Sequence, residues 1–134
     1  MKYEFLEHTS EVKFRAYGKT IEEVFENAIL AFAELIAKGN DISEKKEKSL
    51  KVKKKDNEGY FYDLLDEMIY LLDAENFIVS RGDVKVNEKG LEVIFYGDDS
   101  SKYEGLDHVK AVTYSEMYVC KKNKNWEAQV VLDV

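Results

Sequence analysis

Side chains that can do chemistry stand at three places in this 134-residue sequence. His8 and Glu11 belong to a polar interruption near the start. Lys110 is a lone cation in an otherwise apolar and β-branched run. Asp133 stands directly before Val134, which carries the last carboxylate of the sequence. Carboxylates without cysteine ligands suit a hard divalent cation, such as calcium, magnesium or manganese, rather than zinc. The sequence therefore offers oxygen ligands and an ammonium group, provided that the fold brings these places together.

The fold brings them together only if the two C-terminal strands pair. Residues 108–120 form the longest run of β-branched and aromatic residues, which predicts a strand in the interior of a sheet. Residues 126–134 predict the last strand, and an antiparallel hairpin between the two brings Asp133 and the carboxylate after it toward Lys110. If the strand after Glu11 lies beside them, three carboxylates gather at one sheet edge.

Carboxylates that lie this close together repel one another, and the repulsion must be offset by positive charge. Two of them about 4 Å apart repel by roughly 4 kcal/mol at an effective dielectric of about 20. Lys110 offsets part of this repulsion, and a divalent cation offsets more. The spacing alone nevertheless favours a simpler interpretation, in which Asp133 is a solvated residue near a frayed chain end. His8 also has a simpler interpretation, because a lone histidine is more often a structural hydrogen-bonding residue than a ligand.

Hydrophobic periodicity predicts the other elements of one domain over residues 1–134. Two strands, one helix, one lysine-rich edge strand, a second helix and an antiparallel meander follow one another. In order, they cover residues 3–6, 12–18, 21–38, 43–56, 61–72, 77–87, 91–96, 108–120 and 126–134, with turns at 57–59 and 87–90 and a loop at 97–107. Residues 77–87 are either one strand or a broken pair, 77–79 and 83–87. This order predicts an α+β fold, with two amphipathic helices packed on one face of a mostly antiparallel sheet.

Composition limits the function classes. The formal net charge of −7 argues against a dedicated nucleic-acid binder, so we expect no direct sequence-specific contact with nucleic acid. An RNA contact by the lysine-rich residues 45–55 is a minority alternative. One cysteine, Cys120, excludes an intrachain disulfide and fits a reducing compartment, and the strand pattern makes it a small buried side chain. With no membrane-length apolar run and no signal peptide, we expect a cytoplasmic protein without a membrane partner.

Several segments, in order and from end to end, resemble the archease family. They are the opening His-Thr-Ser-Glu at 8–11, the helix start at 17–28, the helix at 63–72, the Val-Lys-Ala-Val-Thr-Tyr strand at 109–114 and the terminal residues 126–134. The Lys-Ala-Val-Thr-Tyr strand and the final Leu-Asp-Val carry most of the specificity. The resemblance implies the archease fold and an accessory protein, not an enzyme. Its partner would be the GTP-dependent RNA ligase of tRNA splicing and RNA repair, whose guanylylation and multiple turnover it promotes.

The same resemblance implies site residues. A metal ion, calcium in the family pattern, would be held by Glu11, Asp133 and the carboxylate of Val134, with Lys110 as the functional lysine. Two departures stand out: Glu11 replaces the usual aspartate, and Ser115 replaces a frequent histidine. One extra methylene moves a carboxylate by roughly 1.5 Å, so the site is reshaped or tuned to another hard ion, magnesium or manganese included.

Two other functions compete with the accessory role. A stand-alone metal-dependent hydrolase would use Glu11 and Asp133 with His8, although no base, nucleophile or pocket motif accompanies them. A chaperone-like interaction module would need no metal at all.

Overall fold

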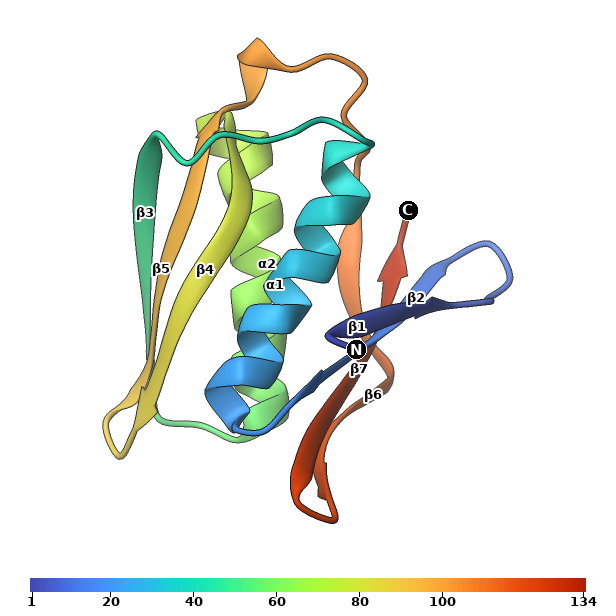
Figure 1. Cartoon of the computed structure of the whole chain (residues 1–134), viewed down its shortest axis with the longest axis vertical. Helices are drawn as coiled ribbons and strands as arrows, with labels where there is room; N and C mark the ends of the chain where they lie inside the picture. The colour runs from blue at the N-terminus through green and yellow to red at the C-terminus, as the bar shows by residue number, and fades with distance from the viewer.

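Two antiparallel sheets enclose a pair of helices in this computed structural model, which describes residues 1–134 (Figure 1). The strands are β1 (Tyr3–Leu6), β2 (Val12–Gly18), β3 (Lys46–Lys53), β4 (Phe77–Asn87), β5 (Gly90–Asp99), β6 (Ala111–Lys122) and β7 (Asn125–Asp133). The helices are α1 (Ile21–Ala37) and α2 (Asn57–Glu75), with a single 3₁₀ turn, η1 (Ser100–Lys102). No helix combines the length and the apolar composition that crossing a membrane requires.

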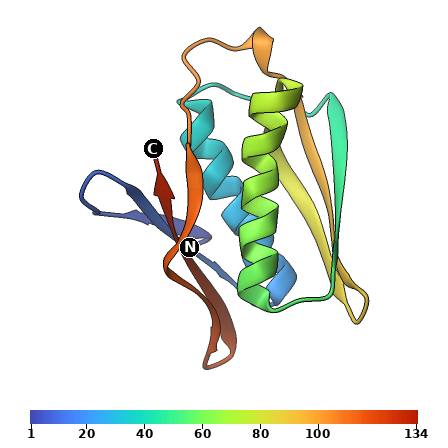
Figure 2. The ribbon, with the colours of Figure 1, turned by 180° about the vertical axis from the view of Figure 1, so that it is seen from behind.

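The strands form a four-stranded sheet of order β1-β2-β7-β6 and a three-stranded sheet of order β3-β5-β4. The helices lie between the sheets, so that each sheet has them on one face (Figures 1 and 2). The predicted single-domain α+β class is therefore confirmed. The division of the strands into two sheets, which places the helices in a central layer, is a feature that the sequence analysis did not predict.

Local capping explains where both helices begin. The Thr20 hydroxyl accepts a hydrogen bond from the Glu23 amide at 3.1 Å, as a threonine N-cap does. The Asp56 carboxylate accepts one from the Gly59 amide at 2.9 Å. The predicted turn at 57–59 is consequently wrong, because these residues form the first turn of α2 once Asp56 caps it.

A single hydrophobic core joins the layers. It contains 31 buried residues from both sheets and both helices. Phe25 of α1 and Phe61 of α2 stack with ring centroids 5.8 Å apart, and both are fully buried. This stack fixes the two helices against each other between the sheets.

Strand β6 differs from the prediction of an interior strand, because it lies at the edge of its sheet. Its pairing with β7 is interrupted between Thr113 and Tyr118, and Glu116 there has a left-handed backbone with φ of 58°. The bulge also breaks the alternation of faces that a regular strand would have. Val112 and Val119 are both buried, although one is at an even and the other at an odd position.

The segment after β5 crosses from one sheet to the other over the ends of the helices (Figure 1). Its first part is more regular than predicted, since β5 continues to Asp99 and η1 follows. Tyr103 and Leu106 are partly buried and pack against the core. The Asp107 amide donates to the Ile36 carbonyl at 2.9 Å, which ties this crossing segment to the end of α1.

The predicted edge strand and hairpin turn are both present. Strand β3 is the edge of the three-stranded sheet. Gly90, at the turn between β4 and β5, has φ of +145°, and a Cβ there would lie 2.0 Å from the Val52 carbonyl oxygen. Glycine is therefore required at this position by both backbone conformation and space.

Candidate functional site

Strand β7 brings the two ends of the chain together by pairing with β2 on one side and β6 on the other. Leu132 is opposite Val12, so the residue after it, Asp133, lies alongside Glu11. On the other side Asp133 is opposite Ala111. The predicted antiparallel hairpin and the predicted place of the strand after Glu11 are thus both found in the structure.

Backbone alternation places the two acidic side chains on the same face of the sheet. Leu132 and Phe14 are fully buried against the helices, so Asp133 and Lys13, one residue away in each strand, face outward. Glu11 is two residues before Lys13 and shares its face. The outer face of the four-stranded sheet therefore carries both predicted carboxylates near one end of β7.

Lys110 lies one residue before β6 rather than inside it. Its amide donates to the Asp133 carbonyl at 2.7 Å, and its residue is exposed. Its ammonium group makes no ion pair. The lysine is thus held by its backbone at the same end of the sheet as Asp133, while its charge stays free.

A charged cluster that the sequence analysis missed lies over this face. Glu116, in the β6 bulge, bonds His8 Nε2 through Oε2 at 2.9 Å and accepts from Lys13 Nζ through Oε1 at 2.9 Å. The bond with His8, followed by that with Lys13, lowers the pKa of Glu116 below its ordinary value. His8 Nδ1 is buried without a hydrogen-bond partner, 3.7 Å from Glu11 Oε1. His8 therefore joins the loop between β1 and β2 to the distant bulge of β6.

Gln129 holds the β6 bulge in place through hydrogen bonds. Its side chain is buried, donates to the Glu116 carbonyl at 2.8 Å and accepts from Arg15 Nε at 2.8 Å. The hydrogen bonds of Gln129 and those of the Glu116 carboxylate hold the same turn of backbone from two sides. This explains why a residue with an unfavourable positive φ can be kept in that conformation.

The side chains as they stand do not fit a closed metal site. No group of three or more His, Cys, Asp or Glu side chains lies close enough together to hold an ion. Glu11 Oε1 instead faces His8, and Glu116 is occupied by His8 and Lys13. The backbone therefore places Glu11 and Asp133 side by side, and no third His, Cys, Asp or Glu side chain joins them in a ligand group.

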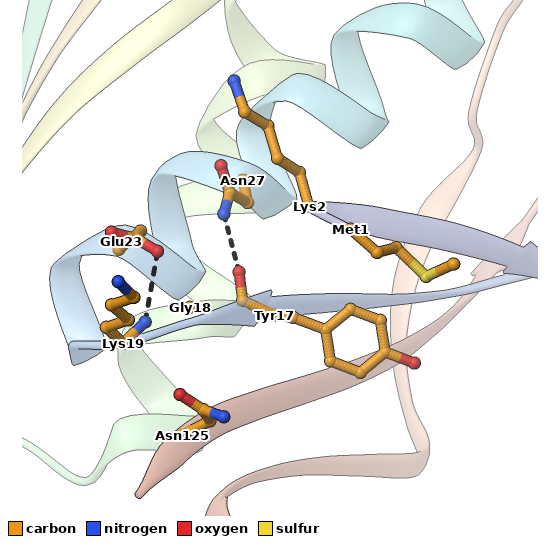
Figure 3. Close-up of a pocket in the computed structure, with 8 residues that line it drawn as sticks. All are labelled: Met1, Lys2, Tyr17, Gly18, Lys19, Glu23, Asn27 and Asn125. Carbon is orange, nitrogen blue, oxygen red and sulfur yellow. Dashed lines mark hydrogen bonds between the residues drawn. The ribbon is translucent and has the colours of Figure 1, made fainter.

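Two surface hollows lie on the four-stranded side of the molecule. One, of about 690 Å³, is at the start of α1 and contains none of the predicted residues (Figure 3). In it Asn27 Nδ2 donates to the Tyr17 carbonyl at 2.6 Å, and the Lys19 amide donates to Glu23 at 3.2 Å. The other, of about 750 Å³, is lined by His8 and Glu11 together with apolar side chains. The second hollow borders the candidate site, and the first lies at the opposite end of β2.

The chain matches a known family over nearly all of its length. Residues 3–134 match the model of the Archease protein family (MTH1598/TM1083). Protein archease of Methanosarcina mazei is 36% identical over 140 residues, covering 99% of this chain and 96% of that protein.

Two solved structures share the fold. The solution structure of protein 1598 of Methanobacterium thermoautotrophicum has a TM-score of 0.77 and 29% identity, covering 99% of both chains. The crystal structure of an archease from Thermotoga maritima, described as a possible chaperone, has a TM-score of 0.63 and 20% identity, covering 96% of this chain and 94% of that one.

The fold and the candidate site thus define a small α+β protein in which the second strand, β2, pairs with the last strand, β7, beneath an acidic and histidine-bearing surface. The whole-chain matches make its relationship specific. The chain belongs to the archease family.

Proposed function

We propose that this protein is an accessory protein, not an enzyme, of the GTP-dependent RNA ligase that acts in tRNA splicing and RNA repair. It promotes guanylylation of the ligase and allows it to turn over repeatedly. The observation that supports this proposal is the pairing of β7 between β2 and β6, because it puts Glu11, Asp133 and Lys110 at one end of one sheet. Family membership supplies the class of partner.

Each residue of the site has a proposed role. Glu11 and Asp133 present negative charge on the outer face, and Lys110 presents a positive charge that no carboxylate of this chain neutralises. An accessory protein changes its partner only by binding one state of it more tightly than another. We therefore propose that these charges contact the ligase in the state that accepts guanylate.

We propose further that Glu11, Asp133 and the carboxylate of Val134 hold a hard divalent cation, with calcium first and magnesium or manganese as alternatives. This part rests on the family resemblance and on the oxygen donors alone. The His, Cys, Asp and Glu side chains do not form a ligand group of three here. The proposal therefore concerns binding of the ion and not a step of the partner's reaction.

The test uses the ligase encoded by the same genome, with guanylylation and multiple-turnover ligation measured with and without the whole chain. Asp133→Ala should abolish the stimulation, and Asp41→Ala, a change at an exposed aspartate after α1, should leave it intact. Calcium, magnesium and manganese binding are measured in parallel by calorimetry. Equal stimulation by the Asp133 variant and the wild type would refute the proposed role of the site.

The same proteins and assays distinguish two other functions from the accessory role. A stand-alone hydrolase would cleave nucleotides or phosphoesters without the ligase, which this proposal does not expect. A chaperone-like module, the role suggested for the Thermotoga maritima relative, would keep its stimulation after chelation of divalent ions from the accessory protein.

A further inference from the structure

Helix α2 has one long face that no other element covers. Figure 2 shows this helix in green, running between β6 and β3 with its outer side toward the viewer. Its buried residues, which include Phe61, Leu64 and Leu65, face the core. The opposite side is open along a helix of 19 residues, roughly 28 Å at 1.5 Å per residue. That length is sufficient to support a protein interface of ordinary size.

Tyrosines line this open face at helical spacing. Tyr62, which is half-buried and packs against the core at the edge of this face, and Tyr70 are eight residues apart along the helix. Tyr70 is 52% exposed, and Tyr114, from the β6 bulge, is 59% exposed. The rings of Tyr62 and Tyr114 stack with centroids 4.5 Å apart and an interplanar angle of 5°. Large exposed aromatic groups held rigid before binding lose little freedom in an interface, which is why tyrosine is common at interface hot spots.

Carboxylates surround these rings, and few of them are neutralised. Helix α2 contains no lysine or arginine, and its acidic residues are Glu58, Asp63, Asp66, Glu67, Asp73 and Glu75. Lys55 pairs with Asp63 at 2.6 Å, and Lys48 pairs with Glu75 at 2.9 Å, both from the side of β3.

The three acidic residues nearest to Tyr70 on the helix, Asp66, Glu67 and Asp73, make no ion pair. Burial, and then the charges of Glu75 and Asp66, raise the pKa of Glu67. The open face is thus a strip of negative charge that its own molecule leaves uncompensated, in a chain whose formal net charge is −7.

We propose that the outer face of α2, together with Tyr114, docks a basic protein surface that presents arginine side chains. A guanidinium group can stack on a tyrosine ring and bond a neighbouring carboxylate at once, so alternating tyrosines and aspartates match it in both geometry and charge. RNA is disfavoured here, because its phosphates would be repelled by the unpaired carboxylates. The inference rests on the proposed function for the identity of the partner. It adds the surface of this protein that binds that partner.

Binding of the whole chain to the RNA ligase of the same genome tests this assignment. The variant Asp66→Lys with Asp73→Lys should weaken binding by about tenfold or more and flatten its dependence on salt. Glu88→Lys with Glu104→Lys makes the same change in net charge at exposed residues outside α2, and should change affinity less than about twofold. Tyr70→Ala should weaken binding, and Tyr70→Phe should restore most of it. Equal affinities for the two double variants would overturn the proposal.

A second measurement does not depend on the ligase. The isotope-labelled protein is titrated with a nona-arginine peptide and, separately, with a single-stranded RNA 12-mer, and amide shifts are recorded by NMR. Shifts that concentrate on α2 and Tyr114 with the peptide, and not with RNA, support the docking surface. Shifts spread evenly over all exposed carboxylates, or a stronger response of α2 to RNA, overturn it. If the ligase does not bind the wild type at all, the proposed function fails, and this titration still decides on the surface.

Discussion

The Lys110 amide donates to the Asp133 carbonyl at 2.7 Å, which fastens the beginning of β6 to the end of β7. Two residues that are 23 positions apart in sequence are therefore fixed neighbours. The end of β7 is part of a sheet with a partner on each side, and Leu132 just before it is fully buried. The interpretation of Asp133 as part of a frayed end is wrong for its backbone, although its side chain is exposed.

The side chain of Lys110 should contribute to function and not to stability. It is exposed and makes no ion pair, so Lys110→Ala should change the free energy of unfolding by about 0.5 kcal/mol or less. The stimulation of the ligase by the Lys110→Ala variant should fall sharply. Urea denaturation and the guanylylation assay measure the two quantities on the same samples. A variant that is both strongly destabilised and inactive would show that the lysine has a structural role instead.

The Glu116 carboxylate should hold the loop between β1 and β2 in place. In Glu116→Gln the negative charge that attracts His8 and Lys13 is lost, so residues 7–10 should exchange their amide hydrogens faster. Hydrogen exchange followed by NMR measures this directly. The same substitution at Glu104, an exposed residue whose side chain makes no hydrogen bond, serves as the control. Unchanged exchange in the loop would mean that β2 alone positions it.

Asp98 predicts a pH dependence of stability. It is buried and accepts hydrogen bonds from the Asp99 amide at 2.8 Å, the Tyr103 hydroxyl at 2.8 Å and Lys102 Nζ at 3.2 Å. These bonds, the Asp99 amide first, lower the pKa of Asp98 below its ordinary value. Its stabilising effect is therefore complete above the unfolded-state pKa of about 3.9 and is lost as the pH falls through the lower folded-state pKa.

The variant Asp98→Asn should accordingly unfold at a lower urea concentration than the wild type at pH 7 and pH 5. The gap should narrow as the pH falls below about 4, since the wild-type carboxylate is then protonated as well. Denaturation curves at pH 7, 5, 4 and 3 give the comparison. A gap that stays constant over this range would mean that the charge of Asp98 is unimportant.

The stack of Phe25 and Phe61 should dominate the packing between the helices. Both rings are fully buried, so Phe61→Ala should cost about 3–5 kcal/mol through lost burial and the cavity that remains. Phe61→Leu should cost clearly less, because it refills most of the volume. Chemical denaturation of the three proteins measures the order, and equal midpoints for the two variants would contradict it.

Local sequence patterns predicted most helices and strands, because hydrophobic periodicity and capping within each segment determine them. The apolar stripe and the Thr20 cap define α1, and alternation defines β2, with no need for distant contacts. The pairing of β6 with β7 was predictable as well, since a short turn joins them. These elements account for the backbone approach of Glu11, Lys110 and Asp133.

Features that depend on distant contacts were not predictable in the same way. His8 and Glu116 are 108 residues apart, and Glu116 reaches its place only through a bulge whose positive φ no residue pattern indicates. The separation into two sheets depends on where the crossing segment carries the chain, which periodicity within strands does not specify. The open face of α2 was visible in the sequence as a polar stripe, but its stack with Tyr114 was not.

The position of β7 has a consequence for synthesis. It comes after the other six strands in the chain, yet it lies between β2 and β6 in the finished sheet. While a ribosome is still making residues 125–133, β2 lacks a neighbour on one side and β6 has none. The four-stranded sheet can therefore close only after translation has passed this strand, and until then the nascent chain exposes strand edges that invite aggregation or chaperone binding.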